Sequence, residues 1–446
     1  MAGIAILGGG ASGVLLALRL LGGGRDGPEV VLVERRAELG AGVAYATHHP
    51  DHLLNVRAAN MSALPDDPGH FAAWLAARGE ACGPDGFAPR RLYAAYLADL
   101  VAPLRAAGRL RQLRAEAVSV APSGPGVVVA CRDARGRALP PLAARAAVVA
   151  TGNEGPPLPH EPWRHTGWGD PGPCRVAADA PVVVVGTGLT MVDRVLWLLH
   201  GGHRGPITAV SRHGLMPRPH RPGLAPLALA AADLPAAPTA LGLTRWLRAR
   251  VAAAEAAGGD WRQVLDGLRP HSQALWRALP LAERRRFLRH GAPLWNVHRH
   301  RIAPLAAERL AGAAERGQFR LVAGRAVDFA ARTGGVTVTV ARRGGAGRLG
   351  LEAAAVFECR GRAPDIAGTD NPLLQFLIGA GLARPDPLGL GLDVAPDGAL
   401  RDAAGRPSDR LFALGPVTAG TFWEITAVPD IRAAARGLAA RLGSGA

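Results

Sequence analysis

Three glycines near the start of the sequence have the spacing of a phosphate-binding turn. Gly8, Gly10 and Gly13 form G-x-G-x-x-G between an apolar stretch at 4–7 and a helical run at 14–21. In such a turn the first glycine permits a tight bend, and the second lets the backbone approach a pyrophosphate. The third lets the helix pack closely on the strand, so that the helix N-terminus faces the phosphates. The pattern predicts dinucleotide binding, with a glycine-rich turn in an ordinary βαβ unit as the alternative.

A carboxylate follows at the position where such a site needs one. The second apolar strand, at 30–33, ends at Glu34, which lies 21 residues after Gly13. A carboxylate there can bind the ribose hydroxyls and would repel a 2′-phosphate. The glycines, the flanking strand and helix, and this acid together favour a dinucleotide without a 2′-phosphate at the first site.

The strand–glycine–helix pattern recurs in the middle of the chain. An apolar strand at 182–185 runs into Gly186 and Gly188, with Met191 in place of the third glycine. The next strand ends in Ser211-Arg212, and an arginine at that place can bind a 2′-phosphate or stack on an adenine. The second unit therefore favours NADPH over NADH, with a surface arginine after a strand as the alternative.

Later strands end in small residues of the same kind. An apolar strand at 146–149 ends in Ala150-Thr151-Gly152, and the strand at 410–414 ends at Gly415. A helix is expected to begin near residues 423–425 and to continue to residue 442. A strand, a glycine and a helix N-terminus together favour the binding of an anion.

These patterns predict an α/β fold with two Rossmann-like dinucleotide-binding domains, the second inserted into the first. The first domain is expected at 1–160 and 350–446 and is predicted to bind FAD. The second is expected at 175–345 and is predicted to bind the nicotinamide nucleotide. Its helical insertion is expected at about 225–315, where alanine and leucine recur with helical spacing.

Composition excludes several classes of function. The net charge of +16 comes from arginine alone, scattered among alanine, glycine and proline, which argues against nucleic-acid binding. No apolar run reaches the roughly 20 residues of a membrane helix. The first strand leaves no room for a signal peptide, so a cytoplasmic protein without membrane partners is expected. The four cysteines, Cys82, Cys131, Cys174 and Cys359, form no C-x-x-C pair, so neither a redox disulfide nor a metal site is expected.

Several stretches resemble one flavoprotein family over nearly the whole chain. They are residues 39–45, 52–56, 61–68, 184–193, 297–304 and 423–429. They are similar to the FAD/NAD(P)-binding family that includes flavin-dependent urate hydroxylase and nitrosuccinate-forming amine oxygenase. Glu358-Cys359-Arg360-Gly361 departs from the pattern, because such flavoproteins usually have a Cys-Thr-Gly turn there.

The resemblance implies an NAD(P)H-dependent FAD monooxygenase that acts on a small, polar, nitrogen-containing substrate and uses molecular oxygen. A flavin reductase with a separate electron acceptor, and a non-catalytic nucleotide-binding protein, are the alternatives. The cofactor-binding residues predicted from the motifs and the resemblance are Gly8, Gly10, Ala11, Ser12, Gly13, Glu34, Arg35, Val43, Leu54, Asn55, Val118, Ala150, Thr151, Gly152, Gly186, Gly188, Leu189, Thr190, Ser211, Arg212, Gly415, Glu424 and Ile425.

Four residues are predicted for the reacting end. Asn55 and Arg57 lie in a loop that follows the ribose-binding strand, and the resemblance places this loop near the isoalloxazine. His298 and Arg299 lie in the inserted domain, where they are expected either to form a polar cluster at a cleft between the domains or to belong to a surface loop. His298 and His300 do not share a helix face, so no metal site is expected there. Neither a nucleophile nor a catalytic triad is expected.

Overall fold

The computed structural model describes residues 2–22, 27–153, 155, 159–169, 172, 176–361 and 365–443, and Cys174 lies outside them. The chain divides into two compact units. Unit 1 comprises residues 1–48, 56–157 and 362–446, and unit 2 comprises residues 49–55 and 158–361.

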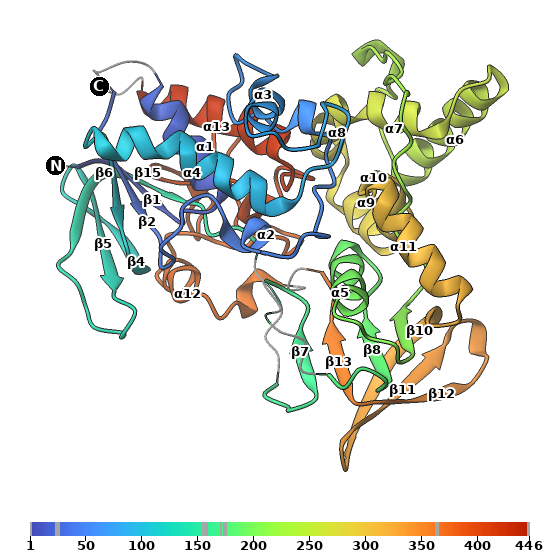
Figure 1. Cartoon of the computed structure of the whole chain (residues 1–446). Coiled ribbons are helices and arrows are strands. Elements are labelled where there is room, and N and C mark those ends of the chain that lie inside the picture. The colour runs from blue at the N-terminus through green and yellow to red at the C-terminus, as the bar shows by residue number, and fades with distance from the viewer. Residues whose placement is uncertain are drawn as a thin grey trace. The chain divides into compact units, whose positions relative to one another are not determined.

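Unit 1 is built on an eight-stranded sheet with the order β14-β15-β6-β1-β2-β3, to which β4 and β5 add a hairpin (Figure 1). β15, β6, β1, β2 and β3 run parallel. The strands are β1 (Ala2–Leu7), β2 (Val30–Val33), β3 (Leu110–Leu113), β4 (Glu116–Ser123), β5 (Gly126–Arg132), β6 (Leu142–Val149), β14 (Ala399–Arg401) and β15 (Pro407–Ala413).

The helices of unit 1 are α1 (Ala11–Leu21), α2 (Gly42–Tyr45), α3 (His70–Ala77), α4 (Arg90–Ala106), α12 (Pro372–Gly379) and α13 (Val428–Gly443). α1 packs against both α4 and α13 (Figure 1), and α12 packs against β4. All four residues of β2 are buried, as expected for a central parallel strand covered on both faces. The core beneath α12 includes Val31, Val149 and Leu411.

Unit 2 contains a seven-stranded sheet with the order β12-β11-β10-β9-β8-β13-β7. Its strands are β7 (Arg164–Thr166), β8 (Val182–Val185), β9 (Ile207–Ser211), β10 (Phe319–Arg332), β11 (Gly335–Arg342), β12 (Arg348–Ala353) and β13 (Ala355–Glu358). β7 to β10 and β13 are parallel, and β11 and β12 extend the sheet as antiparallel strands. The fold class is therefore α/β, as predicted.

The helices of unit 2 are α5 (Leu189–His200), α6 (Ala240–Ala256), α7 (Trp261–Leu268), α8 (Ser272–Ala278), α9 (Leu281–Arg286), α10 (Ala292–Arg299) and α11 (Pro304–Glu315). The helices α6 to α10 lie in the stretch where alanine and leucine recur with helical spacing. Among the described residues, no helix combines the length and the apolar character that crossing a membrane requires.

The two units differ from the expected domain limits at three places. The main part of unit 2 begins at residue 158 rather than at 175, and it includes β7, which pairs with β13. β12 and β13, which together span residues 348–358, belong to unit 2, because β12 pairs with β11 and β13 pairs with β8 in that sheet. Residues 49–55 also group with unit 2, although the chain on both sides of them belongs to unit 1.

The close approach of α1 to β1 gives a first prediction. A Cβ atom added to Gly13 would lie 2.0 Å from the backbone oxygen of Gly8, so the helix or the turn would have to move. We expect Gly13→Ala to lower the free energy of unfolding by about 1–3 kcal/mol, as overpacking does elsewhere. Urea denaturation of the variant measures this. Gly437→Ala in α13, where a Cβ meets nothing within 4 Å, is the control, and equal stability of the two variants would contradict the expected crowding.

Candidate dinucleotide-binding sites

The carboxyl ends of three neighbouring strands meet at one edge of the sheet in unit 1. The amide of Ala150 donates to the carbonyl of Leu7 at 2.8 Å, and the amide of Leu414 donates to the carbonyl of Val149 at 3.0 Å. Gly8, Ala150 and Gly415 therefore follow β1, β6 and β15 at the same edge. In open α/β sheets ligands bind at this edge.

The glycines at this edge are required by close backbone contacts. Gly8 has a φ of +121°, and a Cβ there would lie 2.4 Å from the oxygen of Ala150. Gly415 has a φ of +82°, and its Cβ would lie 2.3 Å from the Oγ of Ser12 in α1. The structure thus brings the C-terminal glycine corner against the first turn of α1.

Gly10 differs from its neighbours because space remains around it. An added Cβ would meet only backbone atoms of Gly42, the nearer at 3.4 Å, which is ordinary contact. Gly10 is also the N-cap of α1, and no side chain accepts a hydrogen bond from the free amides there. A helix N-terminus of this kind binds anions such as a pyrophosphate.

Glu34 lies directly beside the glycine turn. Its carboxylate accepts hydrogen bonds from the amide of Gly9 at 2.9 Å and from the amide of Arg36 at 3.0 Å. The amide of Gly40 donates to the carbonyl of Gly9 at 2.8 Å, so the loop before α2 is fastened to the same turn. The predicted ribose carboxylate and the predicted pyrophosphate turn are therefore neighbours.

Thr151 and Gly152 continue this edge beyond β6. The Oγ1 atom of Thr151 is buried and has no hydrogen-bond partner within the described part of the chain. Gly152 has a φ of +85°, and a Cβ there would meet nothing within 4 Å. A buried hydroxyl without a partner next to open space fits a bound polar ligand. Of the remaining predicted residues in unit 1, Val118 lies at a register shift in β4, Val43 lies in α2, and Arg35 pairs with Glu116 at 3.7 Å.

The expected start of the C-terminal helix is wrong. α13 begins at Val428, and residues 423–427 form turns instead. Glu424 has a φ of +64°, and it is the only residue other than glycine with a positive φ among those described. This conformation interrupts the expected helix. Strained backbone of this kind is common at binding sites. Ile425 is fully buried.

Unit 2 repeats the arrangement at the end of β8. Gly186 has a φ of +107°, and a Cβ there would lie 2.4 Å from the oxygen of Cys359. Around Gly188, the N-cap of α5, a Cβ would meet nothing within 4 Å. Thr187 and Ser211 join the ends of β8 and β9 by a hydrogen bond of 2.8 Å between their hydroxyls. The first turn of α5, with Leu189 and Thr190, therefore begins beside open space.

Arg212 follows β9 and is exposed. Burial and the charges of Arg343 and Arg212 lower the pKa of the neighbouring His213, so these three basic groups lie close enough to interact. Arg342, the residue before Arg343, pairs with Gly324 in β10, and β10 in turn pairs with β9. Two arginines from different parts of the chain thus favour the binding of an anion near the end of β9.

The guanidinium of the unusual Arg360 pairs with a nearby carboxylate. It donates to both carboxylate oxygens of Glu358, at 2.8 and 3.0 Å. Glu358 is 1% exposed and also accepts a hydrogen bond from Arg164 at 3.0 Å. The departure from the expected Cys-Thr-Gly turn therefore forms a buried carboxylate with two arginine partners, which compensates its charge.

The four residues predicted for the reacting end lie in different settings. The backbone oxygen of Asn55 accepts a hydrogen bond from Nε2 of His220 at 3.0 Å within unit 2. Arg57 belongs to unit 1, where it pairs with Asp85 at 3.6 Å. His298 and Arg299 lie in the last turn of α10, at the end of a helix rather than in a loop. The ring of His298 packs edge-on against Trp261 at 4.9 Å.

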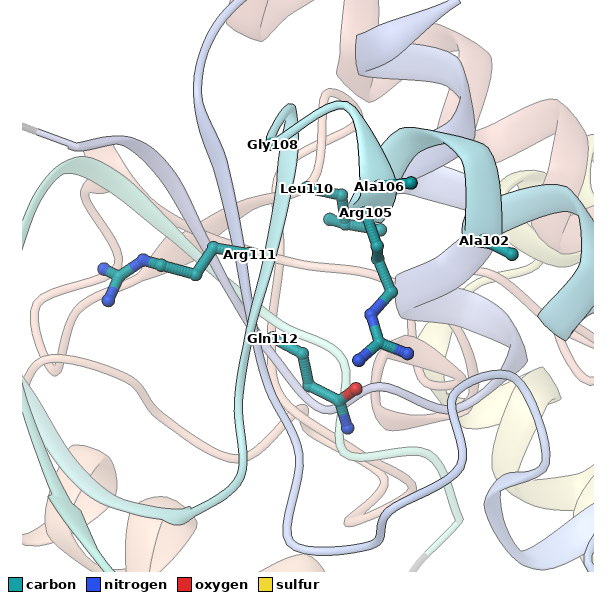
Figure 2. Close-up of a pocket in the computed structure, with 7 residues that line it drawn as sticks. All are labelled: Ala102, Arg105, Ala106, Gly108, Leu110, Arg111 and Gln112. Carbon is teal, nitrogen blue, oxygen red and sulfur yellow. The ribbon is translucent and has the colours of Figure 1, made fainter.

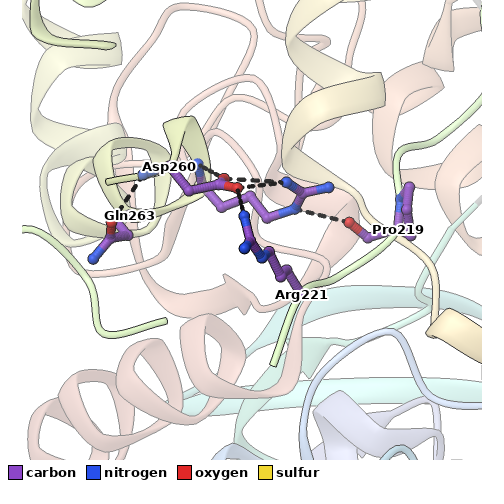
Figure 3. A network of polar contacts seen from close by, with 5 residues as sticks. Pro219, Arg221, Asp260 and Gln263 are labelled. Atoms are coloured by element: carbon purple, nitrogen blue, oxygen red, sulfur yellow. Dashed lines mark hydrogen bonds and ion pairs between the residues drawn. The ribbon is translucent and has the colours of Figure 1, made fainter. Parts of the chain in front are cut away.

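A polar network fixes the helical part of unit 2 around His220. The carboxylate of Asp260 accepts hydrogen bonds from Arg221 at 3.1 Å and from Arg262, and Arg262 also donates to the carbonyl of Pro219 at 3.0 Å (Figure 3). Asp260 caps α7 together with Gln263, whose Oε1 accepts from the amide of Asp260. The network therefore fixes the segment that carries His220. Sequence reasoning missed both Asp260 and His220.

An open pocket of about 580 Å³ lies elsewhere in unit 1, between the end of α4 and β3 (Figure 2). Arg105 and Gln112 extend on one side of β3, while Arg111 points away from them (Figure 2). None of the predicted site residues lines this pocket. It lies beside residues 110–112 of β3 rather than at the carboxyl edge, and it is not the dinucleotide site.

Comparison with known proteins agrees with this geometry. Residues 5–154 match the sequence family described as FAD-NAD(P)-binding. This stretch of the chain therefore resembles an FAD-NAD(P)-binding domain. The match spans β1 to β6 and includes the glycine turn, Glu34 and Thr151, which confirms the predicted resemblance. No curated protein is similar enough in sequence to match the chain.

Solved structures show the same fold over the whole chain. Ornithine hydroxylase from Pseudomonas aeruginosa aligns with a TM-score of 0.67 at 15% identity, over 100% of this chain and 99% of its own. A cadaverine monooxygenase from Erwinia amylovora, solved with FAD, aligns with a TM-score of 0.67 at 13% identity, over 99% and 94%. Bacillithiol disulfide reductase from Bacillus cereus aligns with a TM-score of 0.59 at 15% identity, over 100% and 99%. The fold is thus that of the flavoproteins with two dinucleotide-binding domains.

Proposed function

We propose that the protein is an NAD(P)H-dependent FAD monooxygenase that hydroxylates a small, polar, nitrogen-containing substrate with molecular oxygen. The observation that carries the proposal is the pair of open glycine edges, one in each unit, each beside the N-terminus of a helix. Two such edges provide for two dinucleotides in one chain. Hydroxylases and monooxygenases of ornithine, lysine and cadaverine share the fold over nearly all of this chain.

The residues of unit 1 fit FAD. Gly10 and the free amides of α1 would hold the pyrophosphate, and the Glu34 carboxylate would accept hydrogen bonds from the adenosine ribose. Thr151 would supply its buried, unpartnered hydroxyl. When bound, FAD supplies the chemistry of accepting hydride and activating oxygen, while the chain binds and orients the reactants and excludes water.

In unit 2, Gly188 and the start of α5 would hold the nicotinamide nucleotide. Arg212 would select NADPH by pairing with its 2′-phosphate. On this reading none of the chain's residues acts as a nucleophile, and Asn55 and Arg299 orient the reacting groups. The proposed reaction consumes NAD(P)H, so we propose that the protein works in the cytoplasm. We propose no nucleic-acid or membrane partner.

A flavin reductase remains the second candidate, because a disulfide reductase shares the fold. The cysteines argue against a reductase that uses a redox-active disulfide within its own chain. The sequence has no C-x-x-C pair, and burial raises the pKa of the Cys359 thiol to about 12, so it stays protonated. A reductase that passes electrons to another acceptor needs no cysteine and has to be separated by experiment.

Anaerobic mixing of the purified protein with NADPH tests the proposal. Loss of the oxidised flavin absorbance is expected, and admission of oxygen with amine substrates should then give a hydroxylated product in proportion to the NADPH consumed. NADPH oxidation without any such product across a panel of diamines and amino acids would favour the reductase. A bound flavin that NADPH does not bleach would favour a non-catalytic protein.

Variants at the predicted reacting end give a second prediction. We expect Asn55→Ala and Arg299→Ala to keep FAD but to slow flavin reduction or lower its coupling to product by about tenfold, as the loss of one polar contact does. Stopped-flow absorbance and product yield measure the two effects. Arg285→Ala, at an exposed arginine in α9, is the matched control. Unchanged reduction and coupling in both test variants would remove these residues from the active site.

A further inference from the structure

Three side chains of unit 2 converge on one point outside the dinucleotide sites. They are His49, Asp51 and His200, and one possible ligand atom of each lies within 4.8 Å of those of the other two. Nδ1 of His200 lies 3.0 Å from Oδ2 of Asp51, and the rings of His49 and His200 are 4.6 Å apart between centroids. Residues 149 positions apart in the sequence therefore form one cluster.

The surrounding chain holds this cluster in place. His200 is the last residue of α5, whereas His49 and Asp51 belong to the segment 49–55. Nε2 of the buried His52 contacts the backbone oxygen of Asp193 in α5 at 2.9 Å, which fastens this segment to the helix. The Asp51 side chain is 12% exposed, whereas that of His200 is 49% exposed. Solvent can therefore reach a site whose acidic member is mostly buried.

The donor set indicates which ions would fit. Two imidazole nitrogens and one carboxylate oxygen suit borderline cations such as Zn²⁺, whereas Mg²⁺ and Ca²⁺ prefer oxygen ligands alone. Tetrahedral ligand atoms at about 2.0–2.1 Å from a zinc ion lie roughly 3.3–3.4 Å apart. Nδ1 of His200 and Oδ2 of Asp51 already lie closer than this, at 3.0 Å, and the three ligand atoms of the cluster lie within 4.8 Å of one another. Arg309 also pairs with Asp51, and ligating carboxylates commonly keep such an outer partner.

We propose that His49, Asp51 and His200 form a binding site for one Zn²⁺-like transition-metal ion. The ion joins the segment 49–55 to the end of α5, with Arg309 as the outer partner of Asp51. Asn55 is the last residue of this segment, and its backbone oxygen accepts a hydrogen bond from His220. The ion therefore also restricts the motion of the backbone at Asn55. The site is independent of FAD and of the proposed oxygenase activity.

Zinc binding by the chelator-treated, tag-free full chain tests the proposal directly. Competition with a coloured zinc chelator should give one Zn²⁺ per chain. His49→Ala, His200→Ala and Asp51→Asn should each weaken binding by at least about tenfold, because each removes a ligand or its charge. His290→Ala is the control, since His290 is exposed and lies in a different part of unit 2.

Hydrogen exchange gives a readout that does not depend on affinity. With Zn²⁺ bound, the amides of residues 49–55 should exchange more slowly in the wild-type chain and not in the His200→Ala variant. Circular dichroism of the variants establishes that they are folded. Zinc binding of equal affinity in the wild-type and His200→Ala chains would overturn the proposal. Equal affinity in the wild-type and His49→Ala chains would overturn it as well.

Discussion

The Gly10→Val variant should purify without its yellow flavin and yet remain folded. Gly10 has a φ of −69°, which valine adopts without strain, and an added Cβ finds only the backbone of Gly42 at ordinary contact distance. A Cβ atom at this position therefore has room in the protein, whereas a pyrophosphate at the N-terminus of α1 leaves no space for the branched side chain. We expect loss of essentially all bound FAD.

Flavin absorbance per chain and thermal unfolding of the apoprotein separate these two effects. Gly437→Val, in the exposed face of α13, is the matched control in the same unit and should stay yellow. Gly13→Ala gives the opposite contrast, because there the backbone of Gly8 leaves no space and stability falls first. A yellow Gly10→Val chain with a full complement of FAD would refute the assignment of the pyrophosphate site to this turn.

The elements around both glycine turns could be predicted because their signals are local. A buried parallel strand appears in the sequence as a short apolar run. A tight turn from such a strand into a helix requires glycine at fixed positions, so Gly8 and Gly186 could be recognised from the sequence. Glu34 could be predicted for the same reason, since its place is set by the length of one βαβ unit. In the structure it contacts the amide of Gly9.

Features that depend on distant parts of the chain could not be predicted in this way. The sequence signals a helix across residues 423–428, but the positive φ of Glu424 is imposed by packing and interrupts it. From the sequence, Arg360 is only a departure from the expected Cys-Thr-Gly turn. In the structure, Arg164 and Arg360 both donate hydrogen bonds to the buried carboxylate of Glu358. The contact of Asp51 with His200 also joins residues that are distant in the sequence, so no local sequence pattern predicts it.

The limits of the second unit show the same dependence. β10 runs for 14 residues, from a parallel pairing with β9 into an antiparallel hairpin with β11, whereas the apolar pattern predicts only its first part, at 319–323. Its later residues alternate weakly and are largely exposed, so hydrophobic periodicity does not reveal them. This hairpin brings Arg343 toward Arg212. The two arginines are 131 residues apart in the sequence, so no local pattern predicts that they lie close together.

Replacement of Arg212 by alanine should raise the Michaelis constant for NADPH by about 10- to 150-fold and leave that for NADH nearly unchanged. A charge-assisted hydrogen bond to the 2′-phosphate contributes about 1.5–3 kcal/mol, which corresponds to that range, and NADH lacks the phosphate. Arg212 is exposed at the end of β9, and burial together with the charges of Arg343 and Arg212 lowers the pKa of His213. Arg343 should therefore retain part of the preference for NADPH over NADH in the Arg212→Ala variant.

The comparison of the two nucleotides makes the Arg212→Ala experiment specific. A general disturbance of unit 2 would weaken NADPH and NADH alike, whereas loss of phosphate recognition alters only the ratio of their kcat/KM values. Arg245→Ala, at an exposed arginine in α6, should leave the ratio unchanged. Arg212→Ala with Arg343→Ala should abolish the preference if the two guanidiniums share the phosphate. Equal losses with both nucleotides in the single variant would show that Arg212 does not discriminate between them, and the preference would then have to come from other contacts.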